Sequence, residues 1–96
     1  MKRPRAGDEI VATREITILN ELGLHARPAA EFARRARAFR AEVWIVKDGQ
    51  RFSAVSLIEI LRANLDCGAR AVLEARGRDA EAALEQLARL LQELKD

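Results

Sequence analysis

The sequence predicts an α+β domain in the order β-α-β-β-α-β-α, with three helices on one face of a mostly antiparallel four-stranded sheet. Three observations favour this fold. Two short segments that read as strands are joined by Asp48-Gly49, a strong hairpin signal. Other segments repeat apolar residues at helical spacing. The chain has 96 residues, which is enough for one hydrophobic core but leaves little room for a second.

Seven segments carry this order. The predicted strands are Arg14–Asn20, Glu42–Lys47, Gln50–Ala54 and Ala69–Arg76, and the predicted helices are Ala26–Arg40, Ser56–Leu65 and a long helix capped by Asp79. Pro28 falls in the first turn of the first helix, where its missing N–H costs no hydrogen bond. Ser56 and Glu59 form a Ser-x-x-Glu capping box. Residues 1–11 include several basic residues and no apolar periodicity, so we expect a flexible tail there and a folded domain over residues 12–96.

Composition and charge argue against several function classes. The formal net charge is only +2, and the chain has one tryptophan, three phenylalanines and no tyrosine. We therefore expect no nucleic-acid partner, because clustered charge and an aromatic stacking surface are missing. No apolar run approaches the ~20 residues that a membrane span needs, so we expect no membrane insertion. With Cys67 and His25 each the single residue of its type, we expect no disulfide, no metal site and a cytoplasmic protein.

The stretch Gly23-Leu24-His25-Ala26-Arg27-Pro28-Ala29-Ala30 is the most informative one in the chain. It places the single histidine where a strand gives way to a helix, and a helix N-terminus attracts anions through its N–H groups and partial positive charge. A nucleophilic imidazole beside the guanidinium of Arg27 indicates reversible capture of a phosphoryl group. The alternative is a plain surface or capping histidine, with Arg27 paired to Glu31 one turn later.

The sequence GLHARPAA resembles the phosphorylation motif of the HPr family, the histidine phosphocarriers of the bacterial phosphotransferase system. The resemblance covers about residues 16–94 and implies an open-faced β-sandwich. It implies a carrier and not an enzyme. A phosphoryl group from phosphoenolpyruvate would pass through enzyme I to Nδ1 of His25, and then to a downstream acceptor of the enzyme IIA type. Arg27 would face this group, backbone N–H groups of Ala26 and Arg27 would bind its oxygens, and no cofactor is implied.

A second stretch, SAVSLIEILRANLDCG, resembles the serine-centred motif of the same family. This resemblance implies that Ser56 is a regulatory phosphorylation site for an HPr serine kinase, besides being a helix N-cap. Two positions depart from the family pattern: Val55 stands where a basic or polar residue is usual, and Glu59 stands where glycine is frequent. A phosphate on Ser56 would add negative charge beside apolar surface and weaken docking on an acidic partner.

Two sets of side chains are candidates for partner docking. Arg34 and Arg37 follow Arg27 along the first helix, at a spacing that predicts a basic stripe suited to an acidic partner. Apolar residues of the second helix predict an exposed contact patch. The docking candidates are Ala26, Arg34, Arg37, Leu57, Ile58 and Leu61. We expect a monomer, because a carrier must dock transiently on several proteins.

Two other function classes remain as alternatives. A non-catalytic α+β module could bind RNA or another protein, but this interpretation gives no reason for a histidine at a helix start. An enzyme that used His25 as a general base would need a serine or cysteine beside it and an acid to orient it, and the motif offers neither. Within the carrier hypothesis, sugar uptake and a phosphotransferase-linked regulatory role both stay open. Loop 20–23 and the Val55-Ser56 departure favour the regulatory role.

Overall fold

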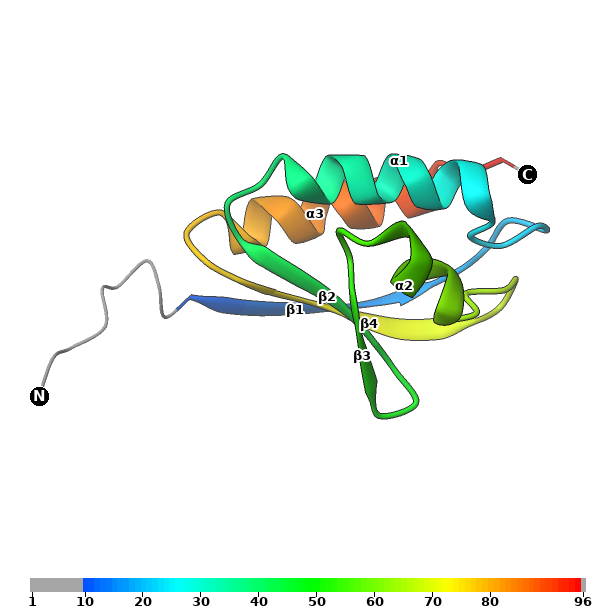
Figure 1. The fold of residues 1–96 in the computed structure, drawn as a ribbon, viewed down its shortest axis with the longest axis horizontal. Helices are drawn as coiled ribbons and strands as arrows, with labels where there is room; N and C mark the ends of the chain where they lie inside the picture. Colours follow the sequence, from blue (N-terminus) through cyan, green and yellow to red (C-terminus); the bar gives the residue numbers. More distant parts are fainter. Residues whose placement is uncertain (1–9, 96) are drawn as a thin grey trace, which may run out of the picture.

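A computed structural model of the chain describes residues 10–95 and has the predicted order of elements (Figure 1). The elements are β1 (Val11–Thr17), α1 (Ala26–Arg37), β2 (Glu42–Lys47), β3 (Gln50–Ser53), α2 (Leu57–Arg62), β4 (Arg70–Arg76) and α3 (Ala80–Gln92). Across residues 10–95, none of the helices has the length and apolar character needed to cross a membrane.

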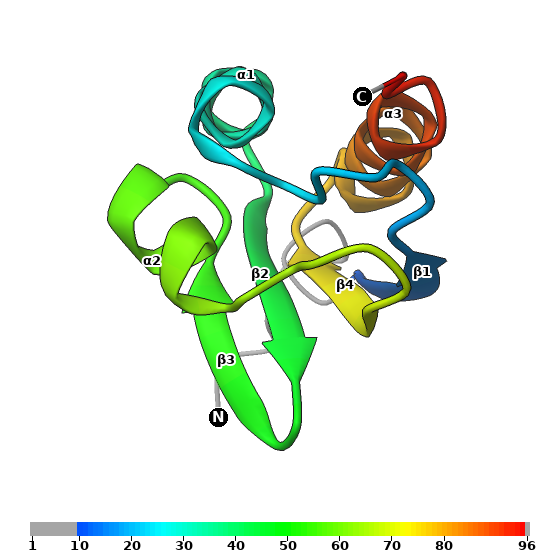
Figure 2. The ribbon, with the colours of Figure 1, turned by 90° about the vertical axis from the view of Figure 1, so that its right-hand side faces the viewer.

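The strands form one antiparallel sheet in the order β1-β4-β2-β3. Figure 2 shows α1 and α3 on one side of this sheet, with α2 beside the hairpin formed by β2 and β3. The hairpin turns at Asp48 and Gly49, which both take a positive φ, as the tight turn requires. The predicted α+β fold, with its three helices on one face of the sheet, is confirmed.

The core lies between the sheet and the helices, because inward-facing side chains of the strands meet the apolar stripes of α1 and α3. Val43 and Ile45 are buried in it, as predicted. The largest fully buried side chains are Phe32, Ile18, Ile45, Ile60, Leu73 and Leu87. Trp44 lies on the other side of the sheet and is half-buried, with the guanidinium of Arg51 4.0 Å from its ring centroid.

The first predicted strand is displaced along the chain. The strand begins at Val11, which pairs with Arg76, whereas the prediction placed Val11 in the tail and began the strand at Arg14. At the other end, Ile18 still forms backbone hydrogen bonds with Gly68 and Ala69, just before β4. Asn20 already belongs to a turn. The rest of the predicted flexible tail, residues 1–9, lies outside the described residues.

Two long-range hydrogen bonds explain the end of α1. Asp79 occupies the N-cap position of α3, as predicted, but its side chain makes no cap hydrogen bond to that helix. Its Oδ2 accepts from the Arg40 N–H at 2.9 Å, and its Oδ1 accepts from the Ala41 N–H at 2.8 Å. The N–H of Arg40 is therefore held by α3 and not by the helix, and α1 ends at Arg37 instead of Arg40.

A lysine caps the C-terminal end of α2. The Nζ of Lys47 donates to the carbonyl oxygens of Ala63 at 2.9 Å and Asn64 at 2.7 Å, and Asn64 takes a positive φ. A cation at this end is favourable, because the last carbonyl groups of a helix carry partial negative charge. The helix therefore stops at Arg62, short of the predicted Leu65.

Candidate functional site

His25 occupies the N-cap of α1, as predicted. Its backbone is extended, with φ −78° and ψ −175°, and its carbonyl oxygen accepts from the Ala29 N–H at 2.9 Å. Its side chain makes no cap hydrogen bond to the helix. The ring is half-buried, and its Nε2 atom is shielded from solvent. The imidazole is thus held at the helix start with one of its two nitrogens covered by protein.

The first turn of α1 is arranged to attract an anion. Ala26 and Arg27 are exposed, and their N–H groups have no partners within a helix. Pro28 follows as a buried residue without an N–H group. The first turn contains no acidic residue, so the positive end of the helix dipole is not cancelled there. Two backbone donors therefore follow His25 directly, and Arg27 adds a guanidinium group in the same helical turn.

Glu31 does not pair with Arg27, which contradicts one of the two interpretations of Arg27. The Glu31 carboxylate accepts from Nε of Arg34 at 3.1 Å and from Nε of Arg35 at 3.0 Å. The hydrogen bond from Arg34, and after it the one from Arg35, lowers the pKa of Glu31. In turn, the bond to Glu31 raises the pKa of Arg34. Within residues 10–95, Arg27 forms no ion pair, which leaves its guanidinium available to an incoming anion.

The predicted basic stripe on α1 is divided between two sides of the helix. Arg27 and Arg34 border a shallow groove that is completed by Leu94, near the end of α3. Arg37 turns to the α2 side, where its Nη1 donates to the Val55 carbonyl oxygen at 3.1 Å. A single continuous stripe is therefore wrong, because the ten residues from Arg27 to Arg37 do not complete whole helical turns.

The apolar patch predicted on α2 is exposed. Its members are Leu57, Ile58 and Leu61, and Ile58 keeps 69% of its surface accessible. Because α1 packs against α2, this patch and the start of α1 lie on the same side of the molecule (Figure 2). Ala26, the remaining docking candidate, is exposed beside His25.

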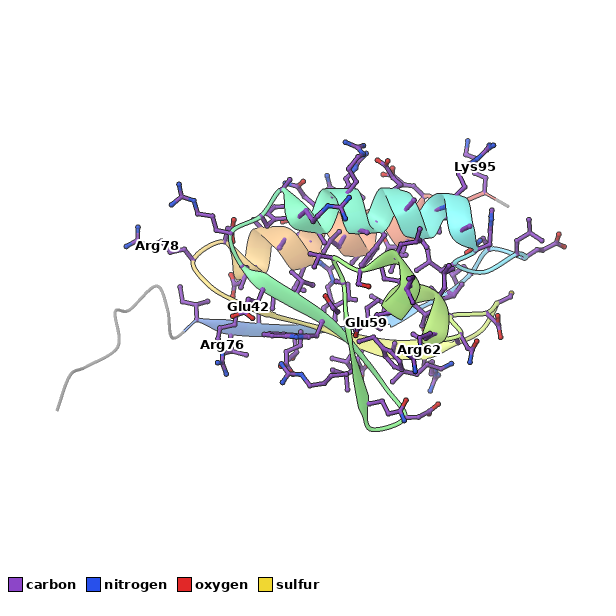
Figure 3. The ribbon with its side chains drawn as sticks, viewed as in Figure 1. Glu42, Glu59, Arg62, Arg76, Arg78 and Lys95 are labelled. Atoms are coloured by element: carbon purple, nitrogen blue, oxygen red, sulfur yellow. The ribbon has the colours of Figure 1, made fainter. Side chains whose placement is uncertain are left out.

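Of the two hydrogen bonds in the predicted capping box at α2, the structure contains one. Ser56 Oγ accepts from the Glu59 N–H at 3.3 Å, which confirms Ser56 as the N-cap. The Glu59 carboxylate, however, accepts from the Ser53 N–H at 3.0 Å and not from Ser56. Figure 3 shows Glu59 between α2 and the sheet, where it joins the helix to the end of β3. The Ser56 hydroxyl group therefore already has a structural role.

One residue of the site was missed in the sequence prediction. Asn20 is buried in the turn before His25, and its Nδ2 donates to the Gly23 carbonyl oxygen at 2.7 Å. The available signal was an asparagine followed three residues later by a glycine, which is typical of a turn. Elsewhere, Cys67 is exposed with a free thiol group. Within residues 10–95, no cluster of three histidine, cysteine or acidic side chains could hold a metal ion.

Comparison with known proteins agrees with this geometry. The family model described as "PTS HPr component phosphorylation site" matches residues 12–93. The phosphocarrier protein NPr of Shewanella violacea is 40% identical over 78 residues, which cover 81% of this chain and 86% of that protein. A crystal structure of HPr from Bacillus anthracis has a TM-score of 0.80 at 35% identity and covers 83% of this chain and 95% of its own.

A further solved structure is that of Crh from Bacillus subtilis, described as a dimer with a swapping domain. It has a TM-score of 0.70 at 37% identity and covers 79% of this chain and 87% of its own. The matched segment includes both sequence motifs and nearly all of the described fold. The chain therefore belongs to the HPr family, the phosphocarrier proteins of the phosphotransferase system, which are carriers and not catalytic enzymes.

Proposed function

We propose that this protein carries a phosphoryl group on Nδ1 of His25, received from enzyme I and ultimately from phosphoenolpyruvate, and delivers it to an enzyme IIA-type acceptor. The observation that carries the proposal is the place of His25 at the N-terminus of α1. Because Nε2 is covered by protein, Nδ1 is the ring nitrogen that a donor protein could reach. The neutral nitrogen attacks phosphorus, and the bond between phosphorus and the donor breaks.

Arg27 and the first turn of α1 would hold the transferred group. Its oxygens would accept from the N–H groups of Ala26 and Arg27, and the Arg27 guanidinium would balance their charge. These contacts are charge-assisted, so Arg27→Ala should slow phosphorylation by about tenfold to a hundredfold, the equivalent of one such hydrogen bond. The absence of an acidic residue from the first turn supports this role, since a carboxylate there would repel the phosphoryl group.

Docking on enzyme I and on the acceptor would use the exposed surface around His25. Ala26 and Arg34 would supply the α1 side of this surface. Arg37, which bonds Val55, and the Leu57, Ile58 and Leu61 patch would supply the α2 side. The arginines suit acidic partners, and apolar residues exposed together are typical of contact surfaces. Ser56 lies beside this patch, so phosphorylation by an HPr serine kinase would place a negative charge on the contact surface.

We further propose that the carrier is monomeric and cytoplasmic, with a carrier domain that begins at β1. The exposed free thiol group of Cys67 agrees with a reducing compartment. Size-exclusion chromatography with light scattering tests the monomer, and a dimer such as that described for Crh would contradict it. Whether the acceptor serves sugar uptake or regulation is decided by transfer from the labelled carrier to candidate acceptors.

The decisive experiment uses purified enzyme I, magnesium and labelled phosphoenolpyruvate. The wild type and Cys67→Ser, an exposed substitution outside the site, should both acquire acid-labile, base-stable label. His25→Ala should acquire none, while its circular dichroism spectrum stays that of the wild type. Label on His25→Ala would place the phosphoryl group elsewhere. No label on the wild type with several enzyme I proteins would contradict the proposal and favour a binding module.

A further inference from the structure

Asn20 is a buried polar residue in the turn that leads to His25. Its exposed fraction is 5%, and no other polar or charged residue within residues 10–95 is as fully buried. Burial of a carboxamide group is unfavourable unless hydrogen bonds replace those lost with water. An apolar side chain at this position would avoid that cost, so the bonds made by the amide group are the feature to explain.

Asn20 closes the turn through two hydrogen bonds to Gly23. Its side-chain Nδ2 donates to the Gly23 carbonyl oxygen at 2.7 Å, and its own carbonyl oxygen accepts from the Gly23 N–H at 3.1 Å. The first bond fixes the peptide group that joins Gly23 to Leu24, one residue before His25. The orientation of that peptide sets the direction in which the chain enters α1.

The same turn rests directly on the segment that follows α2. A Cβ atom at Gly23 would lie 2.6 Å from the Leu65 carbonyl oxygen and 2.8 Å from Cα of Asp66. The Leu24 N–H donates to the Leu65 carbonyl oxygen at 2.8 Å. The turn therefore cannot move toward this segment, and the Asn20 side chain holds it from the other side.

We infer that Asn20 is a positioning residue for phosphoryl transfer, which acts on His25 by fixing the peptide group after Gly23 with its side-chain amide group. The inference rests on the proposed phosphorylation of His25. His25 occupies the N-cap of α1 directly after Leu24, so a change in the Gly23–Leu24 peptide group would displace the backbone that carries the imidazole ring. A displacement of about 1 Å at a reacting group can lower a rate by about a hundredfold.

The chemistry of the bond gives a selective variant. Asn20→Asp keeps the shape of the side chain but replaces the donating NH₂ group by a carboxylate oxygen, which would face the Gly23 carbonyl oxygen at the distance of a hydrogen bond. Asn20→Ala removes the amide group and leaves a small cavity.

Two further variants serve as controls. Glu21→Ala changes an exposed neighbour in the same turn, and Asp79→Ala removes side-chain bonds to backbone near Arg78, which Figure 3 shows at the end of the molecule opposite Lys95.

The experiment measures phosphorylation by enzyme I as a function of carrier concentration, together with the NMR signals of the His25 ring in the unphosphorylated protein. For Asn20→Asp and Asn20→Ala we expect kcat to fall about tenfold or more with little change in KM, because the docking surface is untouched. The His25 signals should shift and broaden. Glu21→Ala and Asp79→Ala should keep the wild-type kcat and ring signals, although Asp79→Ala loses stability.

The outcomes separate this inference from the proposed function. Wild-type kcat and His25 signals in both Asn20 variants would overturn the role of Asn20 while leaving the phosphorylation of His25 intact. Equal losses of kcat in Asp79→Ala would overturn it too, since they would reflect stability alone. If the wild type is not phosphorylated, the proposed function fails, and the ring signals still decide whether Asn20 positions His25.

Discussion

Replacement of Gly23 by alanine tests how tightly the turn before His25 is packed. Gly23 has a φ of +66°, a conformation that is unfavourable for alanine. The added Cβ would also lie 2.6 Å from the Leu65 carbonyl oxygen and 2.8 Å from Cα of Asp66, both backbone atoms that cannot rotate away. The turn and the Leu65-Asp66 segment must therefore separate, and the bond from Leu24 N–H to Leu65 must lengthen or break.

The expected loss has two parts. The left-handed backbone costs alanine about 1 kcal/mol. Separation of the two segments adds about 2 kcal/mol, from a weakened hydrogen bond and from strain at a tightly packed contact. Gly49→Ala supplies the control, because Gly49 has a φ of +78° but nothing within 4 Å of its added Cβ. It should cost only the first part, so the two variants should differ by about 2 kcal/mol.

Urea denaturation followed by circular dichroism measures both free energies of unfolding under the same conditions. The effect of alanine on the unfolded chain is similar at both positions and cancels in the comparison. For a domain of this size, the extra loss at Gly23 should lower the melting temperature by about 8–16 °C relative to Gly49→Ala. Equal losses in the two variants would show that the Leu65-Asp66 segment yields freely, and would refute the argument that the turn is fixed.

Three further predictions concern side chains that bond distant or neighbouring groups. Asp79→Ala should lower the free energy of unfolding by about 2 kcal/mol, because two backbone N–H groups lose a carboxylate acceptor; a change within the error of urea denaturation would contradict this. Lys47→Met should leave α2 less protected in amide hydrogen exchange, since its terminal carbonyl groups lose their cap, and unchanged exchange would argue against the cap. The pKa of Glu31, measured by NMR titration, should lie below 4.5 and rise in Arg34→Gln. The small stabilisation from this pair is therefore present above pH 4.5 and lost as the pH falls through the lowered pKa, and a wild-type midpoint at or above 4.5 would be inconsistent with the pair.

Local patterns were enough to predict the order of the elements and the place of His25. The Asp48-Gly49 turn, the apolar stripes of α1 and α3 and the Ser56 cap depend on residues close together in the sequence. The burial of Ile45 and the half-exposure of Trp44 follow from strand alternation, which survives in the folded sheet.

The misplaced C-terminal ends of α1 and α2 share one physical cause, since both involve polar side chains that bond residues far along the chain. Asp79 ends α1 by bonding Arg40 and Ala41, and Lys47 ends α2 from a neighbouring strand. No sequence pattern within either helix records these bonds. Asn20 was missed for a different reason: its turn is a local feature, but its burial, at 5% exposure, is set by the folded structure and not by a local pattern.

The place of β4 in the sheet also constrains how the protein folds. β4 comes last of the strands in the chain, yet it lies between β1 and β2 and pairs Val11 with Arg76. Only the β2–β3 hairpin can form from neighbouring residues, so β1 has no partner during synthesis until β4 has been made. Folding dominated by such distant pairings is slower than that of a helical bundle of equal length. An incomplete chain that ends before residue 70 therefore exposes both future neighbours of β4 as open edges, which are the parts of the sheet most prone to aggregation.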